Sequence, residues 1–247
     1  MLRVTLVRHG QARFDEDNYD LLSDRGRRQA AALGQWWRTQ SFCPAFAWSG
    51  GMVRQNETAQ LALQALLGAS AARCPDVHVE PRLREFDHRE IFYQHRPDLR
   101  EPAALAHWKA HATDYAQTFA ETYDAALQRW MSGVHDTDYA ESWLQFKARC
   151  VAGLLAVCAA AHDHRSEPEA ARPQTPAELL VFTSSGPISA LIQSCWEVPD
   201  HRVRALQQGL MNSGLTSLRV DAALRWTLET VNACPHLMGG PEEISWR

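Results

Sequence analysis

The 247-residue chain lacks both the cysteine spacing of a zinc site and an excess of basic residues. None of its six cysteines forms a Cys-x-x-Cys pair, and no cysteine–histidine cluster has zinc-finger spacing. We therefore expect free thiols in a reducing compartment. The formal net charge of -4 argues against a general nucleic-acid-binding protein. It still allows a small anionic ligand, because a few arginines can dominate one pocket.

The sequence also shows little that would direct the protein to a membrane. No basic stretch followed by a short apolar run opens it, and we find no apolar run that is long enough to span a bilayer. These features predict a cytoplasmic protein without a membrane partner. Its acidic residues and histidines do not follow the His-Glu-x-x-His pattern or a two-metal carboxylate pattern. We therefore expect no metal and no cofactor.

Short apolar runs alternate with helical segments along the chain. The pattern predicts strands near residues 3–7, 45–48, 77–80 and 179–185, helices at 23–39, 52–67, 140–160 and from 186, an exposed loop at 163–178, and a hairpin at 214–231. Such alternation favours an α/β fold, a three-layer α/β/α sandwich with a mainly parallel sheet. Residues 1–247 are expected to form a single domain. The aromatic, helical stretch at about 91–135 is expected to be a cap insertion.

The first predicted strand ends in Arg8-His9-Gly10. Ligands of open α/β sheets bind at the carboxyl ends of the strands, so this sequence places a cation and a titratable ring where a ligand would lie. Gly10 would let the backbone turn there. Taken alone, the Arg-His pair is more typical of a buried pair that satisfies nearby carboxylates.

Further segments follow this motif in a fixed order. Asp20–Ala30 opens the first predicted helix, Ser49–Ala59 carries Arg54, and Leu83-Arg84-Glu85 supplies a carboxylate. With Arg8-His9-Gly10, these segments resemble the histidine phosphatase (phosphoglycerate-mutase-like) superfamily. Glu141-Ser142 and Arg149 are similar to a further helix of that family. The likeness covers roughly residues 1–90 and 140–220.

The resemblance implies a chemical role for four residues. His9 would attack a phosphoryl group and become phosphohistidine. Arg8 and Arg54 would hold the phosphoryl oxygens, because guanidinium donors match phosphate geometry. Glu85 would give a proton to the leaving oxygen and later take one from water. An ion pair between Glu85 and a neighbouring arginine, Arg82 or Arg84, is the structural alternative for this carboxylate.

Three more residues are expected at the phosphate: Gln11, Ser185 and Gly186. Gly186-Pro187 begins a helix, and the N-terminus of a helix favours an anion. Ser185 stands where the family usually carries a second histidine. Serine keeps one hydrogen-bond donor but no positive charge, and the loss of one preorganised donor commonly costs about 10²–10³ in rate. His88 or His201 could fill the space.

The insertion is rich in aromatic and basic side chains. They would form a lid over a phosphate ester or pack the cap onto the core, and packing is favoured for the tryptophans. These residues are Phe92, Tyr93, His95, Arg96, Trp108 and Trp130.

The sequence thus favours a metal-independent phosphatase acting on a small phosphorylated substrate or a phosphoprotein. A phosphoglycerate-mutase-like phosphotransferase is the first alternative, although the stretch between Gln11 and Asp20 is too short to hold the mutase-type insertion. A catalytically impaired sensor or scaffold that binds a phosphoryl ligand is the second, and Ser185 is its only direct support. Neither the substrate nor the oligomeric state follows from the sequence.

Overall fold

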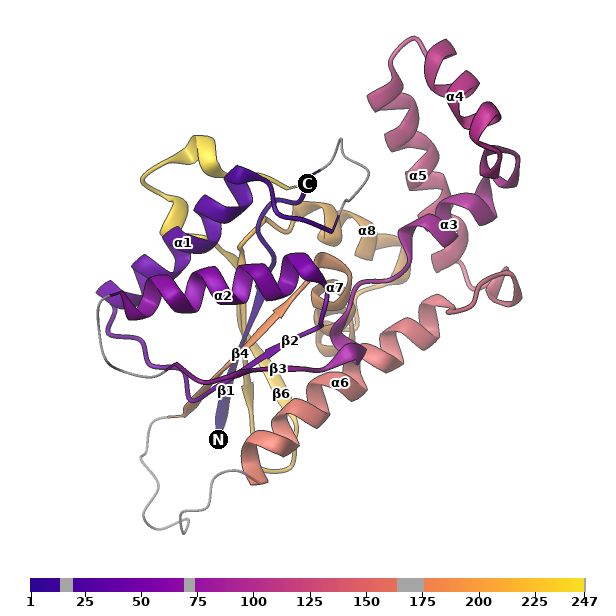
Figure 1. Ribbon diagram of the computed structural model, residues 1–247. Coiled ribbons are helices and arrows are strands. Elements are labelled where there is room, and N and C mark those ends of the chain that lie inside the picture. Colours follow the sequence, from indigo (N-terminus) through magenta and orange to yellow (C-terminus); the bar gives the residue numbers. More distant parts are fainter. Residues whose placement is uncertain (14–19, 69–73, 164–175, 247) are drawn as a thin grey trace.

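The computed structural model describes residues 1–13, 20–68, 74–163 and 176–246 (Figure 1). Its helices and strands follow one another along the chain as β1 (Leu2–Arg8), α1 (Asp24–Thr39), β2 (Phe46–Ser49), α2 (Val53–Leu67), β3 (Val77–Val79), α3 (His88–His95), α4 (Pro102–His111), α5 (Tyr115–Met131), α6 (Trp143–Asp163), β4 (Ala177–Thr183), α7 (Ser185–Trp196), α8 (Asp200–Gly209), β5 (Leu215–Val220) and β6 (Trp226–Ala233).

The six strands form one sheet in the order β3-β2-β4-β1-β5-β6. Strands β3, β2, β4 and β1 pair in parallel, whereas the hairpin of β5 and β6 adds two antiparallel strands at one side. Helices α1 and α2 cover one face of the sheet, and α6 and α7 cover the other (Figure 1). The predicted α/β/α sandwich with a mainly parallel sheet is confirmed, and so is the terminal hairpin.

Strand β1 is buried on both faces. Leu2, Val4 and Leu6 belong to the apolar cluster formed with α6 and α7, and Val7 belongs to the cluster formed with α1 and α2. Successive side chains of a strand point to opposite faces, so a doubly covered strand must be apolar almost throughout. The polar side chains that could meet a ligand therefore lie at the carboxyl end of β1.

Helix α1 begins as the sequence predicts. The Ser23 hydroxyl accepts a hydrogen bond from the Gly26 N–H at 3.1 Å, which is N-cap geometry. Further along, α1 crosses α2 at Gly34, where an added β-carbon would lie 2.0 Å from the carbonyl oxygen of Ala62. The close crossing places the first turn of α2 beside the end of β1.

Helices α3, α4 and α5 extend away from the sheet at one end of the molecule (Figure 1). Trp130 of α5 is 1 % exposed and packs against Phe86 and Trp143, with ring centroids 4.9 and 5.2 Å away. Trp108 contacts aromatic rings of the cap itself, including Phe92 at 6.0 Å. Trp130 therefore fastens the insertion to the core, as the packing interpretation expects.

Helix α6 corrects one expectation. Its 21 residues are long and apolar enough, by length and composition, to cross a membrane, although no such run was expected from the sequence. The core helix of a soluble protein meets the same two criteria. In the part of the chain described here, Phe146, Cys150, Leu154 and Val157 of α6 pack into the same apolar cluster as β1.

Two further boundaries differ from expectation. Helix α8 was not predicted; it follows Pro199, whose restricted backbone suits a helix start. Most of the loop expected at 163–178 lies outside the described residues, and Ala177 and Glu178 belong to β4. The end of α8 adjoins the site, because the carbonyl of its C-cap residue Leu210 accepts a hydrogen bond from Arg8 at the end of β1.

Replacing Gly34 with alanine is expected to lower the free energy of unfolding by about 2 kcal/mol, because the new methyl group forces α1 and α2 apart. Urea unfolding followed by circular dichroism measures this loss. Gly209→Ala in α8 is the matched control, since no atom of the described residues, outside its chain neighbours and its own helix backbone, lies within 4 Å of the position that its new methyl group would take. Equal effects of the two substitutions would contradict the tight crossing.

Candidate functional site

The candidate site lies at the carboxyl end of β1. The His9 N–H donates to the Thr183 carbonyl at 2.9 Å, which continues the pairing of β1 with β4. The His9 carbonyl accepts from the Ser213 N–H at 3.2 Å and from the Asn212 side-chain amide at 3.3 Å. The backbone of His9 is therefore held from both sides, by β4 and by the residues before β5, and this fixes the position from which its side chain projects.

Gly10 makes the turn after His9 possible. An added β-carbon there would lie 2.4 Å from the carbonyl oxygen of Gly26 in α1. The Gly10 N–H donates to the Thr58 hydroxyl at 3.0 Å, and that hydroxyl donates to the Arg54 carbonyl at 2.7 Å. Gly10 therefore connects the end of β1 directly to the first turns of α1 and α2.

The imidazole of His9 is buried, and its two nitrogens have different partners. Nδ1 lies 2.7 Å from the Gly10 carbonyl oxygen, which can only accept, so Nδ1 carries the proton. Nε2 accepts a hydrogen bond from Nε of Arg54 at 3.0 Å. Burial, and then the charges of Arg54 and Arg8, hold the pKa of His9 well below its usual value of 6.5. The ring is therefore neutral, with a lone pair on Nε2.

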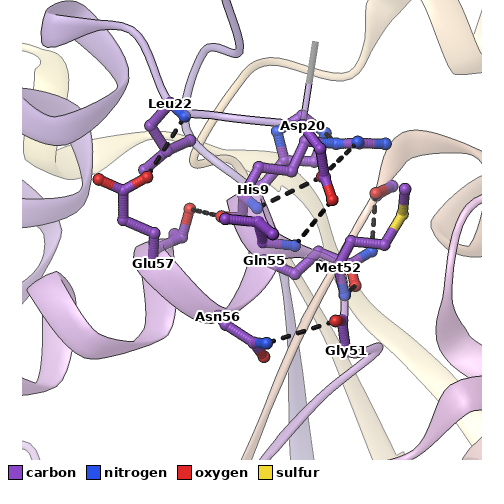
Figure 2. Close-up of polar contacts among 12 residues, drawn as sticks. His9, Asp20, Leu22, Gly51, Met52, Gln55, Asn56 and Glu57 are labelled. Carbon is purple, nitrogen blue, oxygen red and sulfur yellow. Dashed lines mark hydrogen bonds and ion pairs between the residues drawn. The ribbon is translucent and has the colours of Figure 1, made fainter. Parts of the chain in front are cut away.

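Arg54 lies in the first turn of α2, and its side chain is only 2 % exposed. Its Nη1 donates to the Asp20 carboxylate at 2.8 Å. The same carboxylate accepts from the backbone N–H of Val53 at 3.0 Å, so it lies over the N-terminus of α2, close to His9 (Figure 2). Arg54 thus spans His9 and Asp20.

Arg8 is buried and donates to two backbone carbonyls, those of Leu210 and Trp246, the second at 3.1 Å. The segment around Trp246 is fixed by its neighbour. The carbonyl of Ser245 accepts from the Asn212 N–H at 2.8 Å, and its hydroxyl donates to the Asn212 side chain at 2.9 Å. The last described residues of the chain therefore border the site.

The turn before Glu85 is fastened at several points. The Thr183 hydroxyl donates to the Leu83 carbonyl at 2.6 Å, and Arg149 of α6 donates to the Arg84 carbonyl at 3.1 Å. Arg149 is itself held by Glu141 through two contacts of 2.6 and 2.9 Å. Glu141 and Arg149, noted in the sequence for their family likeness, thus belong to the support of Glu85.

The Glu85 carboxyl group sits at the start of α7. It accepts from the Gly186 N–H at 3.1 Å and from the Phe86 N–H at 3.2 Å. Burial raises its pKa above the ordinary value, against the opposing effects of these N–H groups and of Arg54. A β-carbon at Gly186 would lie 1.9 Å from Oε1 of Glu85, so this arrangement requires glycine.

The alternative ion pair for Glu85 loses one of its two partners. Arg82 pairs instead with Glu80, through two contacts of 2.7 Å. The charges of Arg54 and Arg8 both lower the pKa of Glu85, which shows that Glu85 lies at the same site as these two arginines and His9. Gly186 is also there, but its N–H faces Glu85.

Ser185, Gln11 and the two candidate substitutes for the missing histidine occupy different places. Ser185 begins α7, and its hydroxyl makes no hydrogen bond to another described residue. Gln11 uses its amide oxygen to accept from the Ser23 hydroxyl at 3.0 Å, so it fastens the start of α1. The pKa of His88, at the start of α3, is lowered by burial and then by the charge of Arg54, whereas His201 is exposed on α8. Of the two candidate substitutes, His88 is the one whose pKa responds to the charge of Arg54.

Two residues of the site were not assigned a role from the sequence. Asp20 belongs to a motif that was noted, yet its partners at the start of α2 lie 33 and 34 positions away. Asn212 lies three positions before β5, which pairs with β1, and a polar residue so close to a strand beside β1 is a signal that could have found it. The contact of Asp20 with Arg54 forms only because the fold brings the two residues together, and no local sequence pattern indicates it.

A buried neutral imidazole beside two guanidinium groups and a carboxyl group of raised pKa defines a site for a nucleophile and an anion. The model of the histidine phosphatase superfamily (branch 1) matches residues 4–138 and 89–233. The chain belongs to this superfamily. Membership supports phosphatase or phosphotransferase activity in general terms.

Solved structures share the fold along nearly the whole chain. Phosphoglycerate mutase from Bacillus anthracis is 17 % identical, with a TM-score of 0.63 and coverage of 97 % of this chain and 96 % of that one. A mycobacterial glucosyl-3-phosphoglycerate phosphatase with inorganic phosphate is 24 % identical, with a TM-score of 0.57 and coverage of 96 % and 99 %. Phosphoserine phosphatase from Entamoeba histolytica, in complex with 3-phosphoglyceric acid, is 16 % identical, with a TM-score of 0.58 and coverage of 96 % and 100 %. A comparison with curated proteins found no match.

We expect His9 to be neutral at pH 6.5 and the Arg54→Gln substitution to raise its pKa, since one of the charges that lower it is removed. Imidazole carbon–proton NMR across a pH titration measures both, with the signal of His9 identified by its loss in His9→Gln. A wild-type His9 signal with its midpoint at or above pH 6.5 would contradict the neutral assignment. Arg27→Gln, which removes a guanidinium paired with Glu57 on α1 and α2, is the control for a change in net charge.

Proposed function

We propose that this protein is a metal-independent phosphatase that hydrolyses a phosphate monoester through a phosphohistidine intermediate on His9. The observation that carries the proposal is the 3.0 Å contact between Nε of Arg54 and Nε2 of the neutral His9. It places an anion-binding group directly beside a nucleophilic lone pair. Glu85 adds a proton donor to the same site.

In the first step, Nε2 of His9 attacks phosphorus and the P–O bond of the ester breaks. Glu85, whose raised pKa favours the protonated form, gives its proton to the leaving oxygen. Arg8 and Arg54 bind the equatorial oxygens, over which the negative charge spreads in the transition state. The products are an alcohol and phosphohistidine.

In the second step, water attacks the phosphohistidine and the P–N bond breaks. The Glu85 carboxylate takes a proton from the water, and His9 returns to its neutral form as inorganic phosphate is released. The N–H groups of Gly186 and Phe86 stabilise this carboxylate in the interval between the two steps. One carboxyl group can therefore act first as acid and then as base.

A small phosphorylated molecule is the substrate class that we propose, with a phosphoprotein as the alternative. The names of the similar structures support the first: they include a glucosyl-3-phosphoglycerate phosphatase, a phosphoserine phosphatase and a phosphoglycerate mutase. Mutase activity is a second candidate function. The short stretch between Gln11 and Asp20 favours hydrolysis, because it leaves no room for the insertion expected of a mutase. We further propose that the protein works in the cytoplasm.

A binding protein without turnover is the remaining candidate, and Ser185 favours it. Its hydroxyl replaces the charged donor that the family usually places beside the phosphoryl group. The retained imidazole, two arginines and carboxyl group argue for catalysis, because a binding site needs neither a nucleophile nor a proton donor.

The first test is phosphate release from p-nitrophenyl phosphate between about pH 5 and 8, with a chelator present. Wild type is expected to keep its activity in chelator, and His9→Ala is expected to lose it. His201→Ala, on an exposed histidine of α8, is the matched control and should retain wild-type activity. Alkaline quenching with a ³²P-labelled substrate should trap label on wild type but not on His9→Ala.

If neither wild type nor His9→Ala released phosphate from any of a panel of small phosphate esters, the result would favour a binding protein without turnover. Ser185→His would then show whether the restored donor brings turnover back.

Glu85→Gln is expected to lower kcat by about 10²–10⁴ on an alkyl phosphate and by less on p-nitrophenyl phosphate, whose leaving group needs little protonation. Wild-type activity should fall as the pH rises through the raised pKa of Glu85, because the acid form is then lost. This alkaline decline should be absent in Glu85→Gln. Equal losses on the two substrates would contradict the role of Glu85 as an acid. Glu90→Gln, on a carboxylate of α3 that binds the Ala140 N–H, is the matched control.

A further inference from the structure

The guanidinium group that should bind phosphate already holds an anion of the protein itself. Nη1 of Arg54 donates to the Asp20 carboxylate at 2.8 Å. The same carboxylate accepts from the backbone N–H groups of Val53 and Arg54 at 3.0 and 3.4 Å. A guanidinium group and the N-terminal N–H groups of a helix form the kind of seat that binds phosphate in many proteins.

The Asp20 contact also determines how Arg54 lies against the nucleophile. With Nη1 held by Asp20, Nε of the same guanidinium donates to Nε2 of His9 at 3.0 Å. The lone pair that would attack phosphorus is therefore engaged in a hydrogen bond. A phosphoryl group must turn this N–H from His9 to its own oxygen before attack can begin.

The position of Asp20 allows its carboxylate to move away from Arg54. Its side chain is 31 % exposed, whereas that of Arg54 is only 2 % exposed. An arriving phosphoryl group therefore meets a buried cation whose carboxylate partner is partly exposed to the solvent. Two anions at one guanidinium repel each other, since like charges a few ångströms apart near a protein surface are only partly screened.

We propose that Asp20 is an internal anion that occupies the Arg54 seat in the unliganded protein and competes there with phosphate. Asp20 thereby keeps Arg54 in place between turnovers and weakens the binding of the inorganic phosphate product. It is a positioning residue that acts through Arg54. The inference rests on the proposed phosphatase function and adds a residue that governs product release.

The test compares Asp20→Asn with wild type in the binding of inorganic phosphate. Asparagine keeps the shape and an oxygen acceptor for the N–H groups of α2 but removes the charge. Isothermal titration calorimetry should show phosphate binding about tenfold tighter to Asp20→Asn, and the inhibition constant for phosphate should fall in parallel. Asp20→Glu keeps the charge and should bind phosphate as weakly as wild type.

Asp24→Asn is the matched control, since its carboxylate is 86 % exposed and lies near Arg27. It changes the net charge equally and should leave the affinity for phosphate unchanged. If Asp20 only supported Arg54 structurally, Asp20→Asn would bind phosphate more weakly than wild type, and that result or an unchanged affinity would overturn the proposal. Asp20→Ala removes both the charge and the acceptor for the N–H groups at the start of α2. Tighter binding of phosphate to Asp20→Ala as well would support competition by charge.

Wild-type protein that neither hydrolyses p-nitrophenyl phosphate nor binds inorganic phosphate would refute the proposed function itself. Wild-type protein that does both, together with an Asp20→Asn variant of unaltered affinity, would refute only the role of Asp20.

Discussion

The placement of the His9 imidazole between a carbonyl oxygen and a guanidinium group is the constraint on which the site depends. The Gly10 carbonyl fixes the proton on Nδ1, and Arg54 faces Nε2. A charged imidazole would face two buried arginines, so burial and charge act in the same direction. The surroundings of His9 therefore keep its imidazole neutral, so the proposed nucleophile needs no separate base to deprotonate it.

Much of the surrounding structure serves to hold that geometry. Strand β1 enters the site from a doubly covered sheet, and Thr58 connects its end to α2. On the opposite side, Arg149 and Thr183 fasten the turn that carries Glu85. His9, Arg54 and Glu85 lie in loops or in the first turn of a helix, and hydrogen bonds attach each of these segments to a neighbouring helix or strand. Such attachment keeps donors in position without reorganisation during the reaction.

The sequence was sufficient for the features that have local signals. Apolar runs predicted β1 and β4, a capping serine predicted the start of α1, and ordered motifs brought together His9, Arg54 and Glu85. The unbroken apolar run of α6 covers only residues 150–161, which is too short to span a bilayer, and the whole helix passes the criteria for a span only when the mixed residues before that run are counted. Asp20 over α2 and the Trp246 carbonyl on Arg8 could not be predicted, because side-chain contacts to distant backbone leave no periodicity.

The contact of Arg8 with the Trp246 carbonyl joins residues 238 positions apart. During synthesis Arg8 emerges from the ribosome early, and its backbone partner emerges only after almost all of the sheet has been made. Contacts between residues so distant in sequence form slowly, because closing the long loop between them costs conformational entropy before the contact contributes any stability. A nascent chain can thus complete most of its sheet while Arg8 still lacks the Trp246 carbonyl. The hydrogen bonds of Arg8 therefore depend on both ends of the described chain.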